Sequence, residues 1–320
     1  MEILHALNAN LSHGLVVELT AFDPDQDRLS ECAVQWLTQG VRELAGRDVL
    51  GEVGRYRVSE TGTTRFPAMS PRTGSNRWGC VAAAPQGTFE VRYNPYTADV
   101  LPWLRQVVDD RAESVSVTSG VFTQDGDIGN SDVSLSAMFD EELPEYVKLV
   151  VELDEQELLA PDSATAVQDG LLRSVRWACD RYDVVFGHVS YNHACEETEV
   201  EYFLKGSASD PTANTPRWRS HLRGYSWLMV VPAQIAGRLG GADALRASGA
   251  FCSVTALPNG ALLLQATRIF GEYRGAAVAN VHRVVRDVLI SGEFRKPSPL
   301  PGVPPPDMIV LPDFGIAEMP

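Results

Sequence analysis

The sequence lacks several features on which large classes of protein depend. Among its 320 residues there is no run of about 18 apolar residues, so we expect no transmembrane helix. Residues 1–14 contain neither a basic segment nor a long apolar one, so we expect no secretory signal and a cytoplasmic protein. The 5 cysteines are widely spaced without a Cys-x-x-Cys pair, which argues against a disulfide scaffold and a structural zinc site.

Linear signatures of catalysis and of phosphate binding are missing as well. The chain contains no Gly-x-Ser-x-Gly elbow, no Gly-x-x-x-x-Gly-Lys-[Ser/Thr] loop and no Gly-x-Gly-x-x-Gly turn. We therefore expect no cofactor. An enzyme stays open as an alternative, because catalytic groups can meet in a cleft without any linear signature.

Positive charge is in short supply. The chain carries 27 Lys and Arg residues against 42 Asp and Glu residues, a formal net charge of −15. Such a surface repels phosphate backbones and anionic lipid headgroups, so we expect no nucleic-acid partner and no membrane partner, while a basic protein partner is permitted. The composition is otherwise that of a soluble globular protein, with 44% hydrophobic and 22% charged residues.

One segment, LVVEL, occurs twice, at residues 15–19 and at residues 149–153. Three further matches follow in the same order, at offsets between 133 and 137 positions. They pair Ala33-Val34-Gln35 with Ala166-Val167-Gln168, Asp48-Val49 with Asp183-Val184, and Ser116-Val117-Thr118 with Ser253-Val254-Thr255. Matches in one order at nearly one offset predict a tandem duplication, and 320 residues suffice for two domains of about 150 residues.

The hydrophobic patterns predict an α+β fold in each half. Strands are expected at 15–22, 48–58, 77–85, 114–122 and 132–139, and again at 147–153, 183–191, 225–232, 251–258 and 261–270, the last two joined by a two-residue hairpin at Asn259-Gly260. Helices are expected at 29–41, 98–108, 162–182 and 233–245. The order β-α-β-β-α-β with an added strand is the split βαβ, or ferredoxin-like, arrangement, in which helices cover one face of an antiparallel sheet.

These elements divide the chain into a first α+β lobe at 1–143 and a second at 144–292. A last amphipathic helix, expected at 275–289, has no counterpart in the first lobe and should cap the second sheet. Residues 293–320 form a proline-rich, extended tail, which is either an ordered strap across the body or a mobile end.

The densest group of chemically reactive residues is the segment GHVSYNHACEETEVEY. If its second part is a strand, His193, Cys195, Glu197 and Glu199 share one face and could offer ligands to a transition metal. The spacing matches no standard zinc signature, so an exposed polar strand face is the better interpretation. A second group, Asp125, Asp127, Asn130 and Asp132, has oxygen ligands suited to calcium but lacks the terminal glutamate of an EF-hand, so a hairpin turn is favoured there.

Part of the second half resembles the type VI immunity family of bacterial proteins. The resembling features are the aromatic strand with Tyr225 and Trp227, the proline Pro232, the turn Leu239-Gly240-Gly241 followed by Leu245, and the hairpin Leu257-Pro258-Asn259-Gly260 leading to Leu264-Gln265. The resemblance covers about a third of the chain and carries no catalytic residues with it. It implies a non-catalytic protein that binds and neutralises a toxin.

Our leading hypothesis is therefore an immunity or inhibitor protein that binds a basic toxin. Its binding residues would be three acidic segments and an aromatic pair, because carboxylates steer the encounter while aromatic side chains supply the desolvated core of an interface. These residues are Asp23, Asp25, Asp27, Asp140, Glu141, Glu142, Glu196, Glu197, Glu199, Tyr225 and Trp227. The alternative is an enzyme or accessory protein of bacterial specialised metabolism that uses a cleft between the lobes.

Overall fold

The computed structural model describes residues 12–53, 61–62, 76–125, 128–161, 164–193, 196–297 and 303–314. Its strands form one sheet in the order β10-β11-β9-β8-β1-β7-β6-β5-β3-β4-β2. The strands are β1 (Gly14–Phe22), β2 (Thr61–Gly62), β3 (Arg77–Ala84), β4 (Val91–Pro95), β5 (Ser114–Phe122), β6 (Ile128–Met138), β7 (Tyr146–Asp154), β8 (Val184–Tyr191), β9 (Leu228–Val231), β10 (Ser253–Ala256) and β11 (Leu262–Gln265). The fold is mixed α+β, as expected, and the strand pairs whose register is defined are antiparallel.

The α-helices are short, apart from one of 16 residues. They are α2 (Gln26–Gln35), α3 (Val41–Ala45), α4 (Val49–Glu52), α5 (Leu101–Asp109), α6 (Glu155–Leu159), α7 (Ala164–Cys179), α8 (Glu199–Tyr202), α9 (Pro211–Asn214), α10 (Ala233–Arg238), α11 (Gly241–Ala247) and α12 (Ala276–Val285). None of the helices in the described ranges is both long enough and apolar enough to cross a membrane.

By their internal contacts the residues divide into two compact units. Unit 1 comprises Met1–Val17, Leu153–Gln168 and Val185–Pro320, and unit 2 comprises Glu18–Glu152 and Asp169–Val184. Both units are discontinuous in sequence, and their boundaries run through β1, β7, α7 and β8 rather than between residues 143 and 144. Each unit is therefore described by itself.

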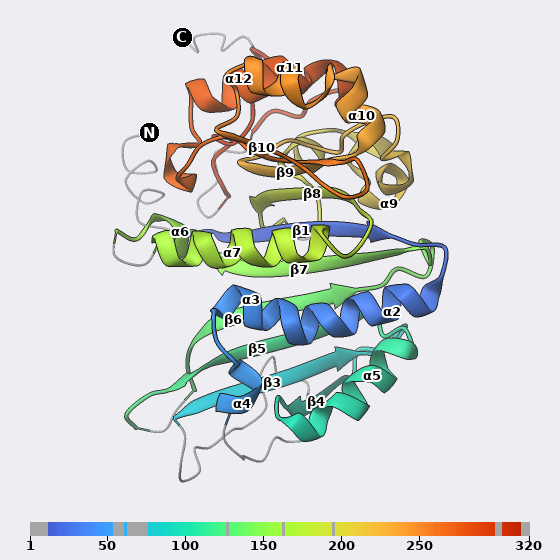
Figure 1. The fold of residues 1–320 in the computed structure, drawn as a ribbon, viewed down its shortest axis with the longest axis vertical. Helices are drawn as coiled ribbons and strands as arrows, with labels where there is room; N and C mark the ends of the chain where they lie inside the picture. The colour runs from blue at the N-terminus through green and yellow to red at the C-terminus, as the bar shows by residue number, and fades with distance from the viewer. Residues whose placement is uncertain are drawn as a thin grey trace, which may run out of the picture. The chain divides into compact units, whose positions relative to one another are not determined.

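In unit 2, helices α2, α3 and α5 lie over strands of the sheet (Figure 1). A single π-helical turn, Trp36–Gly40, joins α2 to α3 and places the Trp36 indole in the core, where its Nε1 donates to the Ser136 carbonyl at 3.0 Å. Gly40 makes this possible, because a Cβ at that position would lie 2.7 Å from the indole ring. The Tyr96 hydroxyl donates to the Leu37 carbonyl at 2.8 Å, so the turn is also tied to the strand side of the unit.

In unit 1, strands β9, β10 and β11 form an antiparallel group whose core contains Trp227 and Phe270, packed edge to face with ring centroids 5.6 Å apart. Within the described part of the tail, residues 307–310 fit the strap alternative. Met308 is fully buried, Asp307 forms an ion pair with Arg274 at 2.8 Å, and the Val310 amide donates to the Tyr225 hydroxyl at 2.6 Å. Residues 307–310 therefore belong to the packed body of unit 1.

Several expectations about local structure are wrong. The strand expected at 48–58 is helix α4 where the structure describes it, because the Asp48 side chain accepts from the Gly51 amide and caps a helix. The hairpin at Asn259-Gly260 forms, but its loop has five residues, since Ala256 pairs with Leu262. The segment after Tyr191 is not a strand, because Thr198 and Glu201 form a capping box that starts α8.

The two LVVEL segments do lie in strands, β1 and β7, which are neighbours in the sheet. Beyond them the strand order runs β6-β5-β3-β4 on one side and β8-β9-β11-β10 on the other. On the side away from β1, β7 therefore lies next to β6, the last strand of the first half. On the side away from β7, β1 lies next to β8, the second strand of the second half. This order does not show two repeated ferredoxin-like units.

A glycine in unit 2 tests how tightly that unit is packed, and a glycine in unit 1 provides the control. Gly170 lies inside α7, and a Cβ there would meet the Leu44 carbonyl oxygen of α3 at 2.3 Å. We expect Gly170→Ala to lower the free energy of unfolding by about 1–3 kcal/mol, although alanine is the better helix former. Gly237 in α10 has open space around it, so Gly237→Ala is the matched control and should stabilise by about 0.5–1 kcal/mol. Urea unfolding of both variants measures this, and a stabilised Gly170→Ala variant would contradict the close contact between α3 and α7.

Candidate functional site

The ends of several strands lie side by side at one end of unit 2. Ser114, the first residue of β5, pairs both with Ala84, the last residue of β3, and with Met138, the last residue of β6. Met138 pairs in turn with Lys148, near the start of β7. The connections that follow β3 and β6 therefore lie beside those that precede β5 and β7.

The ends of β1 and α7 lie at this same place. The Asp23 amide donates to the Glu145 carbonyl at 3.0 Å, and the Phe22 amide donates to the Asp183 carbonyl at 3.0 Å. The Phe22 and Tyr146 rings also meet, with centroids 5.2 Å apart. In Figure 1, β1 and β3 both point toward this end of the unit.

We call this region the acidic end and define it as residues 23–27, 85–90, 109–113, 139–145 and 180–183. These five segments hold thirteen acidic side chains and two basic ones, Arg111 and Arg181, a formal charge of −11 out of the chain's −15. The acidic residues are Asp23, Asp25, Asp27, Glu90, Asp109, Asp110, Glu113, Asp140, Glu141, Glu142, Glu145, Asp180 and Asp183. Two of the three acidic segments predicted from the sequence thus come together in the fold.

Some of these carboxylates stabilise local structure. Asp23 pairs with Arg28 at 3.1 Å, Asp25 caps α2 by accepting from the Asp27 amide at 3.0 Å, and Asp140 accepts from the Glu142 amide at 2.8 Å. The side chains of Glu141, Glu142 and Glu145 are exposed, and they lie in the loop between β6 and β7. These three glutamates can be replaced without removing a helix cap.

The acidic end also presents an aromatic side chain. Phe89, in the turn between β3 and β4, is fully exposed, the most exposed large hydrophobic residue described. Its turn is tied to the β6–β7 connection, because the Gln86 side-chain amide donates to the Phe139 carbonyl at 3.1 Å. The Arg111 guanidinium lies 4.2 Å from the centre of the Phe139 ring. Exposed aromatic side chains are enriched at protein interfaces, and a surface of one charge sign steers a partner of the opposite sign.

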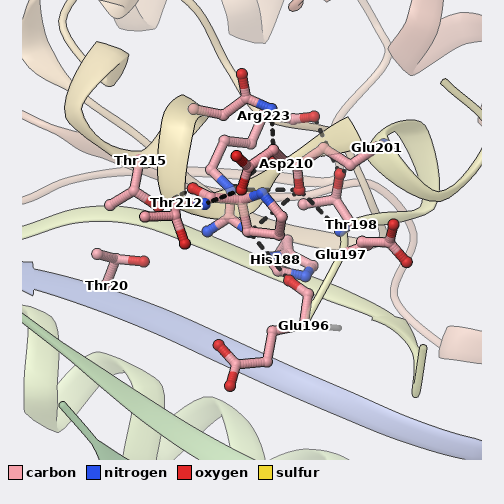
Figure 2. Close-up of polar contacts among 12 residues, drawn as sticks. Thr20, His188, Glu196, Glu197, Thr198, Glu201, Asp210, Thr212, Thr215 and Arg223 are labelled. Carbon is pink, nitrogen blue, oxygen red and sulfur yellow. Dashed lines mark hydrogen bonds and ion pairs between the residues drawn. The ribbon is translucent and has the colours of Figure 1, made fainter. Parts of the chain in front are cut away.

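A network of internal contacts lies next to the third acidic segment, in unit 1 (Figure 2). Glu201 and Arg223 form a fully buried ion pair at 3.0 Å. The Asn214 side-chain amide donates to Glu201 Oε1 at 2.9 Å, the Thr198 amide donates to its Oε2 at 2.9 Å, and Arg223 also donates to the Glu196 carbonyl at 3.1 Å. Arg223 could not be predicted as a buried residue, because an isolated arginine has the pattern of a surface residue.

Of the four predicted metal ligands, His193 and Glu199 contact each other in the structure. Glu199 Oε1 lies 2.8 Å from His193 Nε2 and accepts from the Tyr191 amide at 3.0 Å, and the His193 ring stacks on Tyr202 at 3.8 Å. Burial raises the pKa of Glu197, which is half-buried. Cys195 lies outside the described residues. Within the described ranges no three His, Cys, Asp or Glu side chains are grouped so as to hold a metal ion.

Three of the remaining predicted binding residues, Glu199, Tyr225 and Trp227, are buried in unit 1. Trp227 is fully buried and its Nε1 donates to the Thr267 carbonyl at 2.8 Å, and Tyr225 is buried beneath the strap. Glu199 is buried too, whereas Glu196 and Glu197 are half-buried. Because they are buried, Tyr225, Trp227 and Glu199 do not belong to an exposed binding surface.

The thiols described by the structure are poorly suited to nucleophilic attack. Burial raises the pKa of the Cys80 and Cys179 thiols to about 12, and burial also raises the pKa of the Cys32 thiol. Cys252 is exposed, and desolvation raises the pKa of its thiol as well. Because the thiolate is the reactive form, these four side chains are largely unreactive at neutral pH.

Comparison with known proteins gives a distant structural likeness. No protein-family model matches the chain, and no curated protein matches it in sequence. Its fold is similar to that of a solved structure described as Pseudomonas aeruginosa T6SS protein PA0821, with 14% sequence identity and a TM-score of 0.49 over 89% of this chain and 77% of that chain. A likeness at this level does not establish a shared function.

Proposed function

We propose that this chain is a non-catalytic binding protein that neutralises a bacterial toxin, and that a basic surface of the toxin docks on the acidic end of unit 2. The observation that carries the proposal is the convergence of five separate segments, with formal charge −11, at one end of the unit, together with the fully exposed Phe89 in one of these segments. The resemblance of the second half to type VI immunity proteins makes a toxin the class of partner that we expect.

The two parts of this surface have different roles. A concentrated negative field raises the association rate with a basic protein, and it does so less as salt is added. A protruding aromatic ring slows dissociation once it is buried in a pocket on the partner. Binding of this kind needs no reactive side chain.

Co-expression tests the function. Each protein encoded beside the gene for this chain would be produced in bacteria alone and together with this chain. We expect one of them to stop growth when alone, to be harmless in the presence of this chain, and to purify with it as a stable complex. If none is toxic, and the purified chain instead turns over or binds a small metabolite, the toxin hypothesis is wrong and the enzyme alternative takes its place.

The same assay localises the surface. The variant Glu141→Lys/Glu142→Lys/Glu145→Lys reverses three exposed charges of the acidic end and should protect cells poorly. Its matched control is Asp99→Lys/Asp125→Lys/Asp169→Lys, which makes the same charge change at exposed positions of unit 2 outside the acidic end. We expect the control to protect as well as the natural sequence does.

A further inference from the structure

Acidic residues are absent from two stretches of unit 1. Residues 211–242 and 273–286 contain seven arginines and no Asp or Glu, although 46 residues would hold about six acidic residues at the chain's average of 42 in 320. Five of the seven arginines are exposed. Arg223 and Arg274 are the other two, and they form the internal ion pairs with Glu201 and with Glu155 and Asp307.

The fold brings the two stretches together. The Leu222 amide donates to the Val288 carbonyl at 2.8 Å, and the Ile290 amide donates to the Leu222 carbonyl at 2.9 Å. Arg238 joins the same parts, because its guanidinium donates to the Ser220 carbonyl and, at 3.4 Å, to the Asp287 carbonyl.

We call the resulting surface the arginine face and define it as the exposed side chains of Arg217, Arg219, Arg238, Arg283 and Arg286. Asp287, which is largely exposed, lies 3.6 Å from Arg286, and together with the five arginines it is counted in the charge of this face. The face therefore carries a formal charge of about +4 on a chain whose net charge is −15.

The chemistry of this face favours carboxylates. A guanidinium is planar and always charged, and it binds a carboxylate through two parallel hydrogen bonds. Phosphate would suit it equally in geometry, but a nucleic acid or an anionic membrane is an extended polyanion that the net charge of −15 repels. Protein carboxylates concentrated in a patch of limited size are the better match.

A carboxylate-rich patch of this kind is present on the chain itself, at the acidic end of unit 2. We propose that the arginine face of one copy binds the acidic end of a second copy, so that the protein self-associates head to tail. Such a contact is heterologous, because it uses two different surfaces, and it can repeat from copy to copy. The basic partner proposed above would compete for the acidic end and would break the association.

Ionic strength should affect this association in a characteristic way. Two copies of net charge −15 repel each other at long range, and that repulsion is screened beyond about 8 Å near physiological salt. The local attraction between the two surfaces is screened only at higher salt. We therefore expect dimers and larger species at about 100 mM NaCl, and at least a tenfold weaker association at about 500 mM NaCl.

Two charge variants provide the decisive test by sedimentation velocity at concentrations up to about 100 μM. Glu141→Lys/Glu142→Lys/Glu145→Lys disables the acidic end, and Arg217→Glu/Arg283→Glu/Arg286→Glu disables the arginine face. Each variant alone should be monomeric, whereas an equal mixture should form dimers and nothing larger, because each member keeps one intact surface. Circular dichroism and the thermal midpoint of each variant establish that it is folded.

Several results would overturn the inference. They are a natural chain that is monomeric throughout this range, self-association that survives in either variant, and a mixture that stays monomeric. Retention of a polyanion such as heparin at about 100 mM NaCl, lost in the arginine variant while the natural chain stays monomeric, would assign the face to an extended anion instead. None of these results bears on toxin neutralisation, which co-expression decides separately.

Discussion

Replacing Arg223 by methionine should lower the free energy of unfolding by about 3–5 kcal/mol, the largest effect that we expect from a single substitution. Glu201 is fully buried, and without Arg223 its negative charge would have no cation beside it. For the unit that contains it, this corresponds to a fall of roughly 6–20 °C in thermal midpoint. Calorimetry and urea unfolding measure the change.

A double-mutant cycle separates the charge from the packing. Glu201→Gln removes the charge but keeps only one acceptor oxygen, so either the Asn214 side-chain amide or the Thr198 amide loses its acceptor. We expect Glu201→Gln alone to be costly and the double variant Arg223→Met/Glu201→Gln to cost clearly less than the sum of the two single variants. Two results would contradict a buried ion pair whose members depend on each other. One is additive losses in the free energy of unfolding, and the other is an Arg223→Met variant whose free energy of unfolding lies within about 1 kcal/mol of that of the natural protein.

The second large effect concerns the rate of partner binding. With the toxin found by co-expression, Glu141→Lys/Glu142→Lys/Glu145→Lys should lower the association rate constant at low salt by about tenfold or more, because six units of charge change at the acidic end. The difference should shrink as salt rises, since exposed charges are screened. Stopped-flow fluorescence over a range of NaCl concentrations measures both quantities.

The exposed aromatic residue provides the complementary control. Phe89→Ala leaves the charge unchanged, so it should leave the association rate nearly unchanged and speed dissociation by about 30-fold, as expected for a residue worth 2 kcal/mol or more at an interface. If both variants changed only the dissociation rate, the acidic end would be a contact surface without a steering role. If neither changed either rate, the partner would bind elsewhere.

Much of the local structure could be predicted from hydrophobic patterns. The β-branched and apolar runs that predicted β1, β3, β5, β7 and β8 form those strands, because a run of this kind is buried whichever neighbour it pairs with. The pattern failed where a polar residue decided the outcome. Asp48 and Thr198 each cap a helix inside a segment that alternates like a strand.

The arrangement of the strands could not be predicted in this way. The repeat of LVVEL indicates two similar strands, but nothing in the repeat specifies that they lie next to each other in one sheet. The acidic end depends on this arrangement, because its five segments are up to about 160 positions apart in the sequence. Acidic runs are visible in a sequence, whereas their convergence follows from strand order.

Burial explains the remaining differences at the candidate site. Tyr225 and Trp227 are aromatic residues of a resembling segment, and the fold uses them in the core beneath the strap and against Phe270. Phe89 was not recognised, because a single aromatic residue next to a short strand has the pattern of a core position. Whether an aromatic side chain packs inward or protrudes depends on tertiary contacts that the pattern does not contain.

The most direct test of the central claim is the hydrogen-exchange footprint of the complex with the neutralised toxin. We predict slower amide exchange in the complex at residues 85–90 and 139–145, with residues 23–27 protected beside them, and little change in α10 and α12 of unit 1. Protection confined to unit 1, with residues 85–90 and 139–145 exchanging as in the free protein, would contradict the assignment of the acidic end as the binding surface.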